Sequence, residues 1–146
     1  MAKFKPLIDK LFWIISIPTF VILAIVTTIV FIFPASAAII IIILADLATV
    51  YFLISPLFGY VELRESTLFI KYGFLMKREI PYDKIRDTVK EHRFISESML
   101  SLKNAFEHVN IKYNTFDVTT VSVTDNDAFI TELKARINYS FDNEAK

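Results

Sequence analysis

The sequence predicts a two-helix transmembrane hairpin followed by an α+β, mostly β barrel that one C-terminal helix caps. The first observation is a stretch of 51 residues, from Leu11 to Val61, that holds a single charged side chain, Asp46. The second is a series of short alternating runs after Tyr60, separated by turn residues, which is typical of antiparallel strands. The third is a final segment whose apolar residues recur at helical spacing.

The composition of the 146-residue chain excludes several classes of protein. Its mean hydropathy of +0.48 and its apolar content of 54% are too high for an ordinary soluble domain of this length. The formal charge is +2 for residues 1–10 and −1 for residues 62–146, so no strongly basic domain is present to bind nucleic acid. With no cysteine and two glycines, the chain has no thiolate nucleophile and no glycine-rich phosphate loop, and we expect neither catalysis nor a cofactor.

Residues 1–10 are predicted to form a cytoplasmic head, followed by transmembrane helices at about residues 11–33 and 37–57. The first run has 23 uncharged residues, which at about 1.5 Å per residue cover the bilayer core of about 30 Å. Pro34 and the small residues after it interrupt the apolar pattern, so the two runs form a hairpin. Neither run has the polar stripe that a core helix of a soluble protein would show.

The basic residues that flank the two runs predict their orientation. They are Lys3, Lys5 and Lys10 before the first run and Arg64, Lys71, Lys77 and Arg78 after the second. Since the connection has none, the positive-inside rule places both termini in the cytoplasm and the protein in the cell (inner) membrane as a multi-pass protein. A cleaved signal peptide ending at residues 35–37 is an alternative, although the apolar core of such a peptide is about 7 to 15 residues long.

Aromatic residues mark the cytoplasmic ends of both predicted helices, as expected for anchors at a membrane interface. They are Phe12, Trp13, Tyr51, Phe52, Phe58 and Tyr60. Asp46 is different, because a carboxylate at the bilayer centre costs about 2.5 to 3.5 kcal/mol. In a hairpin it lies at the depth of Ala24, within reach of the Thr27 and Thr28 hydroxyls. It either holds the hairpin or a homo-oligomer together, or it belongs to an ion or proton pathway.

Residues 58–138 are predicted to form the β-rich cytoplasmic domain. Its strands are expected at residues 60–64, 67–72, 75–80, 85–92, 106–113 and 116–123, with an irregular stretch at 94–104. Thr124 and Asp127 make a capping-box-like start to a helix that ends near Asn138. The apolar stripe of this helix consists of Phe129, Ile130, Leu133 and Ile137, and residues 139–146 are expected to fray.

Several motifs stand in order in this domain: Gly73, then Ile80-Pro81-Tyr82 and Ile85, then the Ser/Leu-rich residues 98–102 before Ile111-Lys112-Tyr113, and finally Phe129-Ile130 and Leu133. In this order they resemble the small bacterial PH-like domains, in particular the membrane-anchored YyaB-like group. The resemblance covers about residues 58–137 and implies a seven-strand PH-like barrel capped by a helix, with no enzymatic activity. His108 stands where the group has an arginine, so no ligand is carried over from the group.

Two candidate binding features follow from the residues. By the period of two, one face of the fourth strand carries a cationic stripe made of Lys84, Arg86, Thr88, Lys90 and His92, to which Lys77 and Arg78 add. Such a stripe binds anionic lipid headgroups or a protein partner, or it is simply a solvated strand face. The second feature is the loop with Ser98, Met99, Leu100 and Leu102, which either docks a partner or closes one end of the barrel.

Metal binding and acid–base catalysis by histidine are not expected. His92 follows Glu91 and His108 follows Glu107, and neighbours in a strand point to opposite faces, so neither pair converges on one ion. The sequence therefore predicts a membrane-anchored adaptor that docks a protein partner or lipid headgroups at the inner leaflet. Bacteriocin immunity or cell-envelope stress protection is one alternative, and a small ion- or proton-coupled membrane component built around Asp46 is another.

Overall fold

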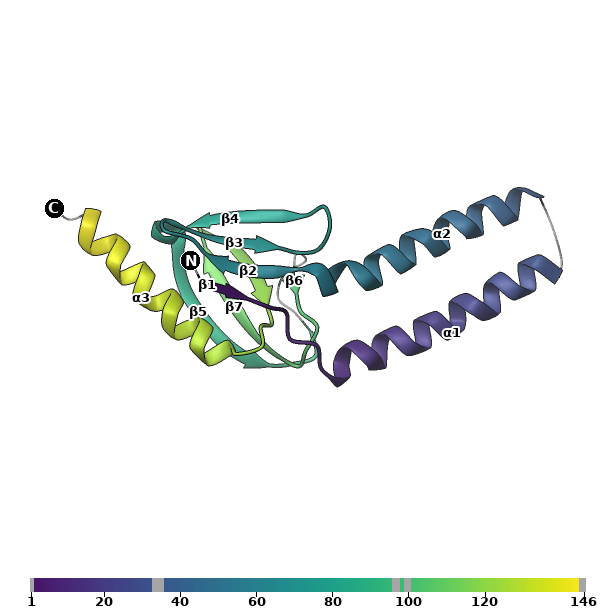
Figure 1. The fold of residues 1–146 in the computed structure, drawn as a ribbon, viewed down its shortest axis with the longest axis horizontal. Helices are drawn as coiled ribbons and strands as arrows, with labels where there is room; N and C mark the ends of the chain where they lie inside the picture. The colour runs from purple at the N-terminus through teal and green to yellow at the C-terminus, as the bar shows by residue number, and fades with distance from the viewer. Residues whose placement is uncertain (1, 33–35, 96–97, 99–100, 145–146) are drawn as a thin grey trace.

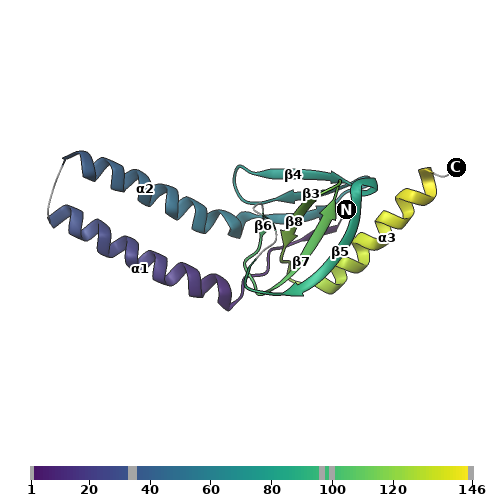
Figure 2. The same ribbon diagram turned by 180° about the vertical axis from the view of Figure 1, so that it is seen from behind.

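A computed structural model describes residues 2–32, 36–95, 98 and 101–144 (Figure 1). Two long helices project side by side from one end of a module built of two β-sheets, and a third helix lies against the module and points away from the first two (Figures 1 and 2). The predicted fold class, two apolar helices followed by a PH-like β module with a C-terminal helix, is confirmed.

The two projecting helices are α1 (Lys10–Ile32) and α2 (Ser36–Ile54), and the 3₁₀ turn η1 (Ser55–Phe58) continues α2. Lys10–Ile32 and Ile39–Phe58 are each long and apolar enough to cross a membrane, and 6% and 0% of their most apolar stretches are buried in the molecule. A helix in the core of a soluble protein would be mostly buried. The exposed apolar surface of both helices therefore indicates that the chain associates with a membrane.

The first sheet has the order β1-β2-β3-β4, with every neighbouring pair antiparallel. Its strands are β1 (Ala2–Phe4), β2 (Tyr60–Leu63), β3 (Thr67–Lys71) and β4 (Lys77–Pro81). The alternation that predicted β2 reflects its burial, since Val61 and Leu63 are fully buried while their neighbours are partly exposed. After β4, the short turn η2 (Tyr82–Lys84) leads into the second sheet.

The second sheet has the order β5-β7-β8-β6. Its strands are β5 (Ile85–His92), β6 (Ser101–Leu102), β7 (Glu107–Tyr113) and β8 (Asp117–Val121). The predicted hairpin between β7 and β8 is present, and its turn uses Asn114 at a φ of 50°, a conformation that Asn tolerates better than most residues. The two-residue β6 pairs in parallel with β8 and lies within the stretch predicted to be irregular.

The C-terminal helix α3 (Asn126–Glu144) packs its predicted stripe on the core, with Phe129 and Leu133 fully buried. Two details of the prediction are wrong. The side chain that caps the helix is Asp125, whose Oδ1 accepts a hydrogen bond from the Ala128 amide at 2.9 Å, because Thr124 is used to bond the N-terminal segment. The helix also continues past Asn138 to Glu144, since no Gly or Pro stops it there.

Residues 1–10 were predicted to form a separate head, whereas residues 2–4 form a strand of the module. Strand β1 pairs with β2, and the Phe4 ring lies edge-on to Phe129 of α3 with the ring centroids 5.3 Å apart. The backbone amide of Leu7 then donates to the Ser122 carbonyl at 2.9 Å. The N-terminal segment is therefore part of the β module, although α1 and α2 separate it from β2 in the sequence.

Candidate functional site

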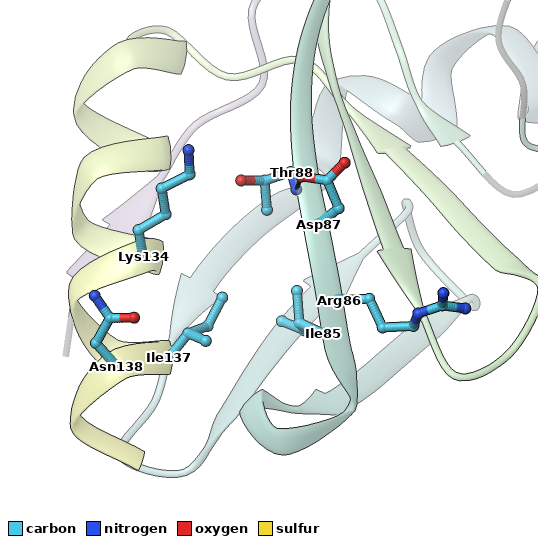
Figure 3. Close-up of a pocket in the computed structure, with 7 residues that line it drawn as sticks. All are labelled: Ile85, Arg86, Asp87, Thr88, Lys134, Ile137 and Asn138. Carbon is cyan, nitrogen blue, oxygen red and sulfur yellow. Dashed lines mark hydrogen bonds between the residues drawn. The ribbon is translucent and has the colours of Figure 1, made fainter. Parts of the chain in front are cut away.

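The predicted cationic stripe of β5 is interrupted by a β-bulge. The register of β5 against β7 shifts between Ile85 and Asp87, so Arg86 is the extra residue. In Figure 3, Thr88 lies on the side of β5 that faces α3, whereas Arg86 points to the opposite side. A bulge reverses the alternation beyond it. The prediction that Arg86 shares one face with Thr88, Lys90 and His92 is therefore wrong.

The remaining basic residues of the stripe already have partners. Lys90 Nζ donates to both carboxylate oxygens of Asp127 at 2.9 and 2.8 Å and lies 3.3 Å from Glu107 Oε1. The hydrogen bonds that Lys90 donates, above all those to Asp127, raise the pKa of Lys90. The His92 ring stacks on Phe106 at 5.8 Å, and Lys84 lies 3.8 Å from Asp83. Of these residues, Lys90 alone bonds the start of α3, while Lys84 and His92 have partners elsewhere.

A cleft of about 240 Å³ lies between β5 and α3 (Figure 3). Ile85 and Ile137 approach one another across it, and Lys134 from α3 stands opposite Thr88. The Thr88 hydroxyl is buried and has no hydrogen-bond partner within the described residues. With Asn138 also at its edge, the cleft offers hydroxyl, amide and ammonium groups to a small polar group or to water.

A larger hollow, about 450 Å³, lies on the other side of β5 and is called here the far-end hollow. It is lined by the start of β5 and by the β7–β8 hairpin, including Arg86, Lys112, Phe116 and Asp117. The guanidinium of Arg86 is held by the Thr115 carbonyl at 2.7 Å, and the Phe116 side chain is 93% exposed. A fixed arginine beside an exposed aromatic ring is the composition that protein interfaces favour at their centres.

The far-end hollow lies at the opposite end of the sheets from α1 and α2. Strand β4 begins at the turn beside η1 and ends at η2, and the Asn114 amide of the β7–β8 turn donates to the Lys84 carbonyl of η2 at 3.0 Å. Figures 1 and 2 show η2 and the β7–β8 turn at the end of the module away from the long helices. Lys84 and Arg86 therefore do not lie next to those helices.

Lys77 and Arg78 belong to β4 in the other sheet. Lys77 is exposed at the helix-side start of the strand. The Arg78 guanidinium donates to the Tyr113 hydroxyl and lies 5.6 Å from the centre of the Tyr113 ring. Burial raises the pKa of Tyr113 although Arg78 lowers it, so the hydroxyl stays protonated. Arg78 thus joins the two sheets and adds nothing to the face of β5.

The candidate partner loop is described only in part. Met99 and Leu100 lie outside the described residues. Leu102 is fully buried in the core, as the alternative of a closed barrel end predicts. Ser98 is partly buried, and Lys103 Nζ donates to the carbonyls of Arg93 and Phe94 at 2.6 and 2.9 Å, which holds the described parts of the loop together.

The contact predicted for Asp46 between the two apolar helices is present. The Thr27 hydroxyl of α1 donates to Asp46 Oδ2 of α2 at 2.6 Å. Thr28, the other candidate partner, donates instead to the Ala24 carbonyl of its own helix at 2.7 Å. Asp46 therefore bonds α2 to α1 through one hydroxyl, and this contact favours its structural role.

Sequence reasoning missed the contact that joins α1 to the β module. Asp9 caps α1, since its Oδ1 accepts from the Leu11 amide at 2.7 Å, while its Oδ2 accepts from the Phe106 amide at 2.9 Å. The Asp9 amide also donates to the Asn104 carbonyl at 3.2 Å. An aspartate directly before a helix is a recognisable capping signal, but its second partner, nearly a hundred residues away, leaves no mark on the sequence.

The two Glu–His neighbours are arranged as strand geometry predicts. Glu91 stands opposite His108 across β5 and β7 with Oε2 and Nε2 4.0 Å apart, whereas His92 stands opposite Glu107. One glutamate and one histidine are too few for a structural or catalytic zinc site. Within the described residues, no group of three or more His, Asp or Glu side chains is placed to hold a metal ion.

The comparisons with known proteins identify the β module. A family model described as a bacterial PH domain matches residues 59–137, which is more than half of the chain. The match begins just before β2 and ends within α3, so it leaves out α1, α2 and strand β1. No curated protein and no solved structure matches the chain.

Proposed function

The chain belongs to the bacterial PH domain family, and from that premise we propose that it is a membrane-anchored binding module that docks a protein partner on its far-end hollow. PH domains are generally interaction modules without catalytic activity, which supports a binding or regulatory role for this chain. The observation that carries the finer proposal is the position of the hollow, at the end of the module away from α1 and α2.

Several features support an anchor that spans the membrane twice. Both helices carry exposed apolar side chains along their length, and aromatic residues such as Trp13 and Phe52 stand at the ends next to the module. Because β1 and β2 are paired, the start of α1 and the end of α2 lie at the same end of the hairpin. This pairing supports the predicted topology, in which both termini are cytoplasmic in the inner membrane.

The geometry favours a protein partner over the headgroups of the same bilayer for the predicted residues of β5. Arg86 and Lys84 are at the far end of the module, and Lys90 is neutralised by Asp127 and Glu107. Attraction to an anionic membrane surface falls off within about 8 to 10 Å at physiological salt. Arg86 together with the exposed Phe116 instead suits an interface that closes over an aromatic anchor.

The subgroup and the alternatives belong to the same proposal. The motif Ile80-Pro81-Tyr82 after Gly73, combined with two preceding apolar helices, supports membership of the YyaB-like group. Bacteriocin immunity or envelope stress protection fits the same architecture and stays a prediction. The hydrogen bond between Thr27 and Asp46 supports a structural role for Asp46 rather than an ion pathway.

A photo-crosslinking experiment in intact cells tests the docking proposal. A photoreactive amino acid at Phe116 is expected to give one discrete protein adduct, and Arg86→Ala is expected to abolish it without changing the amount of chain in the membrane. The same amino acid at Tyr139, which is 70% exposed on α3, is the matched control and should give no adduct. Adducts to phospholipid at position 116 would favour headgroup docking, and equal adducts at both positions would contradict a specific partner surface.

A further inference from the structure

The turn between β3 and β4 carries three consecutive exposed apolar side chains. Phe74, Leu75 and Met76, called here the 74–76 turn, are 46%, 80% and 50% exposed. Turns that face water are usually built from Gly, Pro, Asn, Asp and Ser, whose local geometry and hydrogen bonding suit them. Three adjacent large apolar residues at the tip of a hairpin therefore indicate a surface that something other than water covers.

The 74–76 turn is fastened to the end of α2. The Phe74 amide donates to the Ser55 hydroxyl of η1 at 3.1 Å. Gly73 has a φ of 152°, and a Cβ at this position would lie 1.9 Å from Ser55 Oγ, so only glycine permits the close approach. Figures 1 and 2 both show the β3–β4 turn beside the end of α2, where this helix meets the module.

Ring contacts place the turn at the level where α2 and η1 end. The Phe74 ring lies 4.6 Å from the Phe58 ring and 5.8 Å from the Tyr51 ring, measured between centroids. Phe58 is the last residue of the second candidate membrane span. A bilayer that surrounds this span has its interface at the depth of Phe58, and the 74–76 turn then lies in that interface.

Lysines stand directly behind the turn. Lys71 and Lys77 are paired across β3 and β4, and Lys71 and Lys3 lie 5.8 and 3.7 Å from the centre of the Tyr60 ring. Like charges directly opposite one another destabilise a hairpin in water. Next to anionic headgroups, the same two lysines are attracted to the membrane surface. Apolar residues followed by lysines match the order of the acyl-chain and headgroup layers in a leaflet.

We propose that the 74–76 turn inserts into the interface of the same bilayer that α1 and α2 span, as a third anchor that fixes the tilt of the module. The inference rests on the membrane anchor proposed above. It commits to lipid as the occupant, because the apolar tip continues the surface of a candidate span and the lysines complement anionic headgroups. A fixed tilt would hold the far-end hollow away from the membrane surface.

The absence of native cysteines makes the test direct. Leu75→Cys and Phe116→Cys, each labelled with an environment-sensitive dye in the full chain, are reconstituted in vesicles of phosphatidylcholine and phosphatidylglycerol. Phe116 is the matched control, because it is a highly exposed apolar residue in a hairpin turn at the other end of the module. We expect the dye at position 75 to be quenched by spin-labelled lipid and protected several-fold from aqueous iodide, and the dye at position 116 to show the reverse.

The outcomes separate this inference from the membrane anchor. Equal iodide quenching at both positions, in chains that float with the vesicles, would overturn the third anchor and leave the spanning helices in place. Protection from iodide without quenching by spin-labelled lipid, disappearing when the chain is diluted into more lipid, would assign the turn to a second copy and overturn the inference. Chains that do not float with the vesicles would contradict the membrane anchor itself.

Discussion

Asp46 shows how one polar residue in an apolar helix is accommodated. Its carboxyl group accepts a hydrogen bond from the Thr27 hydroxyl of the neighbouring helix. Hydrogen bonds of this kind stabilise the association of helices in membranes by about 0.6 to 2 kcal/mol. The sequence predicted the depth of Asp46 and both threonines, because a short hairpin fixes which residues lie level. It did not decide between Thr27 and Thr28, because that choice depends on the rotation of α1.

We predict that Asp46→Leu and Thr27→Ala each loosen the helix pair, whereas Asp46→Asn keeps it, since an asparagine oxygen still accepts the hydroxyl proton. Disulfide formation between single cysteines placed on α1 and α2 measures the packing. Thr28→Ala is the control, because Thr28 bonds only its own helix. Proton flux across vesicles that Asp46→Asn abolishes would instead favour the ion-coupled alternative.

Glu107 links β7 to the start of α3 and makes that contact sensitive to acid. Its carboxylate accepts a hydrogen bond from the side-chain Nδ2 of Asn126 at 3.0 Å and pairs with Lys90. The Asn126 hydrogen bond, followed by Lys90, lowers the pKa of Glu107 below its ordinary 4.5 against the effect of burial. A lowered folded pKa gives stability that is present above pH 4.5 and is lost as the pH falls through the folded value.

We therefore predict that the melting temperature of the module falls on acidification below about pH 4.5, and that Glu107→Gln removes part of this decrease. The measurement is thermal unfolding in detergent micelles at a series of pH values, followed by circular dichroism. Glu65→Gln, in the exposed turn between β2 and β3, is the control. The same pH dependence in Glu107→Gln and in the unaltered chain would contradict this role of Glu107.

At the scale of elements, the β3–β4 hairpin depends on Gly73 more than its sequence suggests. The sequence predicts a turn between the strands at residues 67–72 and 75–80, and a turn is present between β3 and β4. The sequence did not reveal that η1 presses against it, with Ser55 Oγ where a Cβ would stand. A positive φ is a local property of the chain, which a sequence pattern can indicate. The close approach of Ser55 to Gly73 instead comes from the packing of two segments that are distant in the sequence.

We predict that Gly73→Ala destabilises the module by about 1 to 3 kcal/mol, through backbone strain and the clash with Ser55. Leu75→Ala, two residues further along on an 80% exposed side chain, should cost almost nothing in detergent. Chemical denaturation of both variants provides the comparison. Equal stability of the two would show that the turn moves away from η1 at no cost.

Strand β5 shows why the alternation of side chains along a strand was not sufficient to predict which residues share a face. Period-two reasoning correctly predicted a strand over residues 85–92, but a single bulge at Arg86 separates the residues before it from those after it. A bulge bends its strand and increases the local twist of the sheet. The bend that a strand needs depends on how the whole module is assembled. As a result, Thr88 lies on the side of the cleft beside α3, whereas the Arg86 side chain points away from α3 and lines the far-end hollow.

At the scale of the whole molecule, the first residues complete the last domain. Strand β1 covers the edge of β2, and Phe4 packs on Phe129 of α3. Residues 58–146 alone would lack this strand and expose part of the core, so the full chain is the right object for binding experiments. The pairing of β1 with β2 joins the segments before α1 and after α2 in one sheet.

We predict that Phe4→Ala lowers the free energy of unfolding of the β module by about 1 to 3 kcal/mol, although Phe4 precedes α1 and α2 in the sequence. Lys5→Ala is the matched control, because Lys5 contributes only its carbonyl group, which accepts from Thr124. Thermal unfolding in detergent compares the two. A Phe4→Ala variant as stable as Lys5→Ala would mean that β1 is not needed for the fold.

The sequence by itself determined the two apolar helices, the series of short strands and the amphipathic C-terminal helix, because each depends on local periodicity and composition. The order of its motifs carried the resemblance to the PH-like domains, which the family match then confirmed. Only the tertiary structure decided that β1 joins β2, that Asp9 bonds Phe106, that Arg86 bulges away from α3 and that the 74–76 turn lies beside Phe58. These contacts join residues far apart in the chain, and a single sequence carries no periodic signal for them. The candidate binding surfaces depend on such contacts, so the sequence predicted their residues only in part.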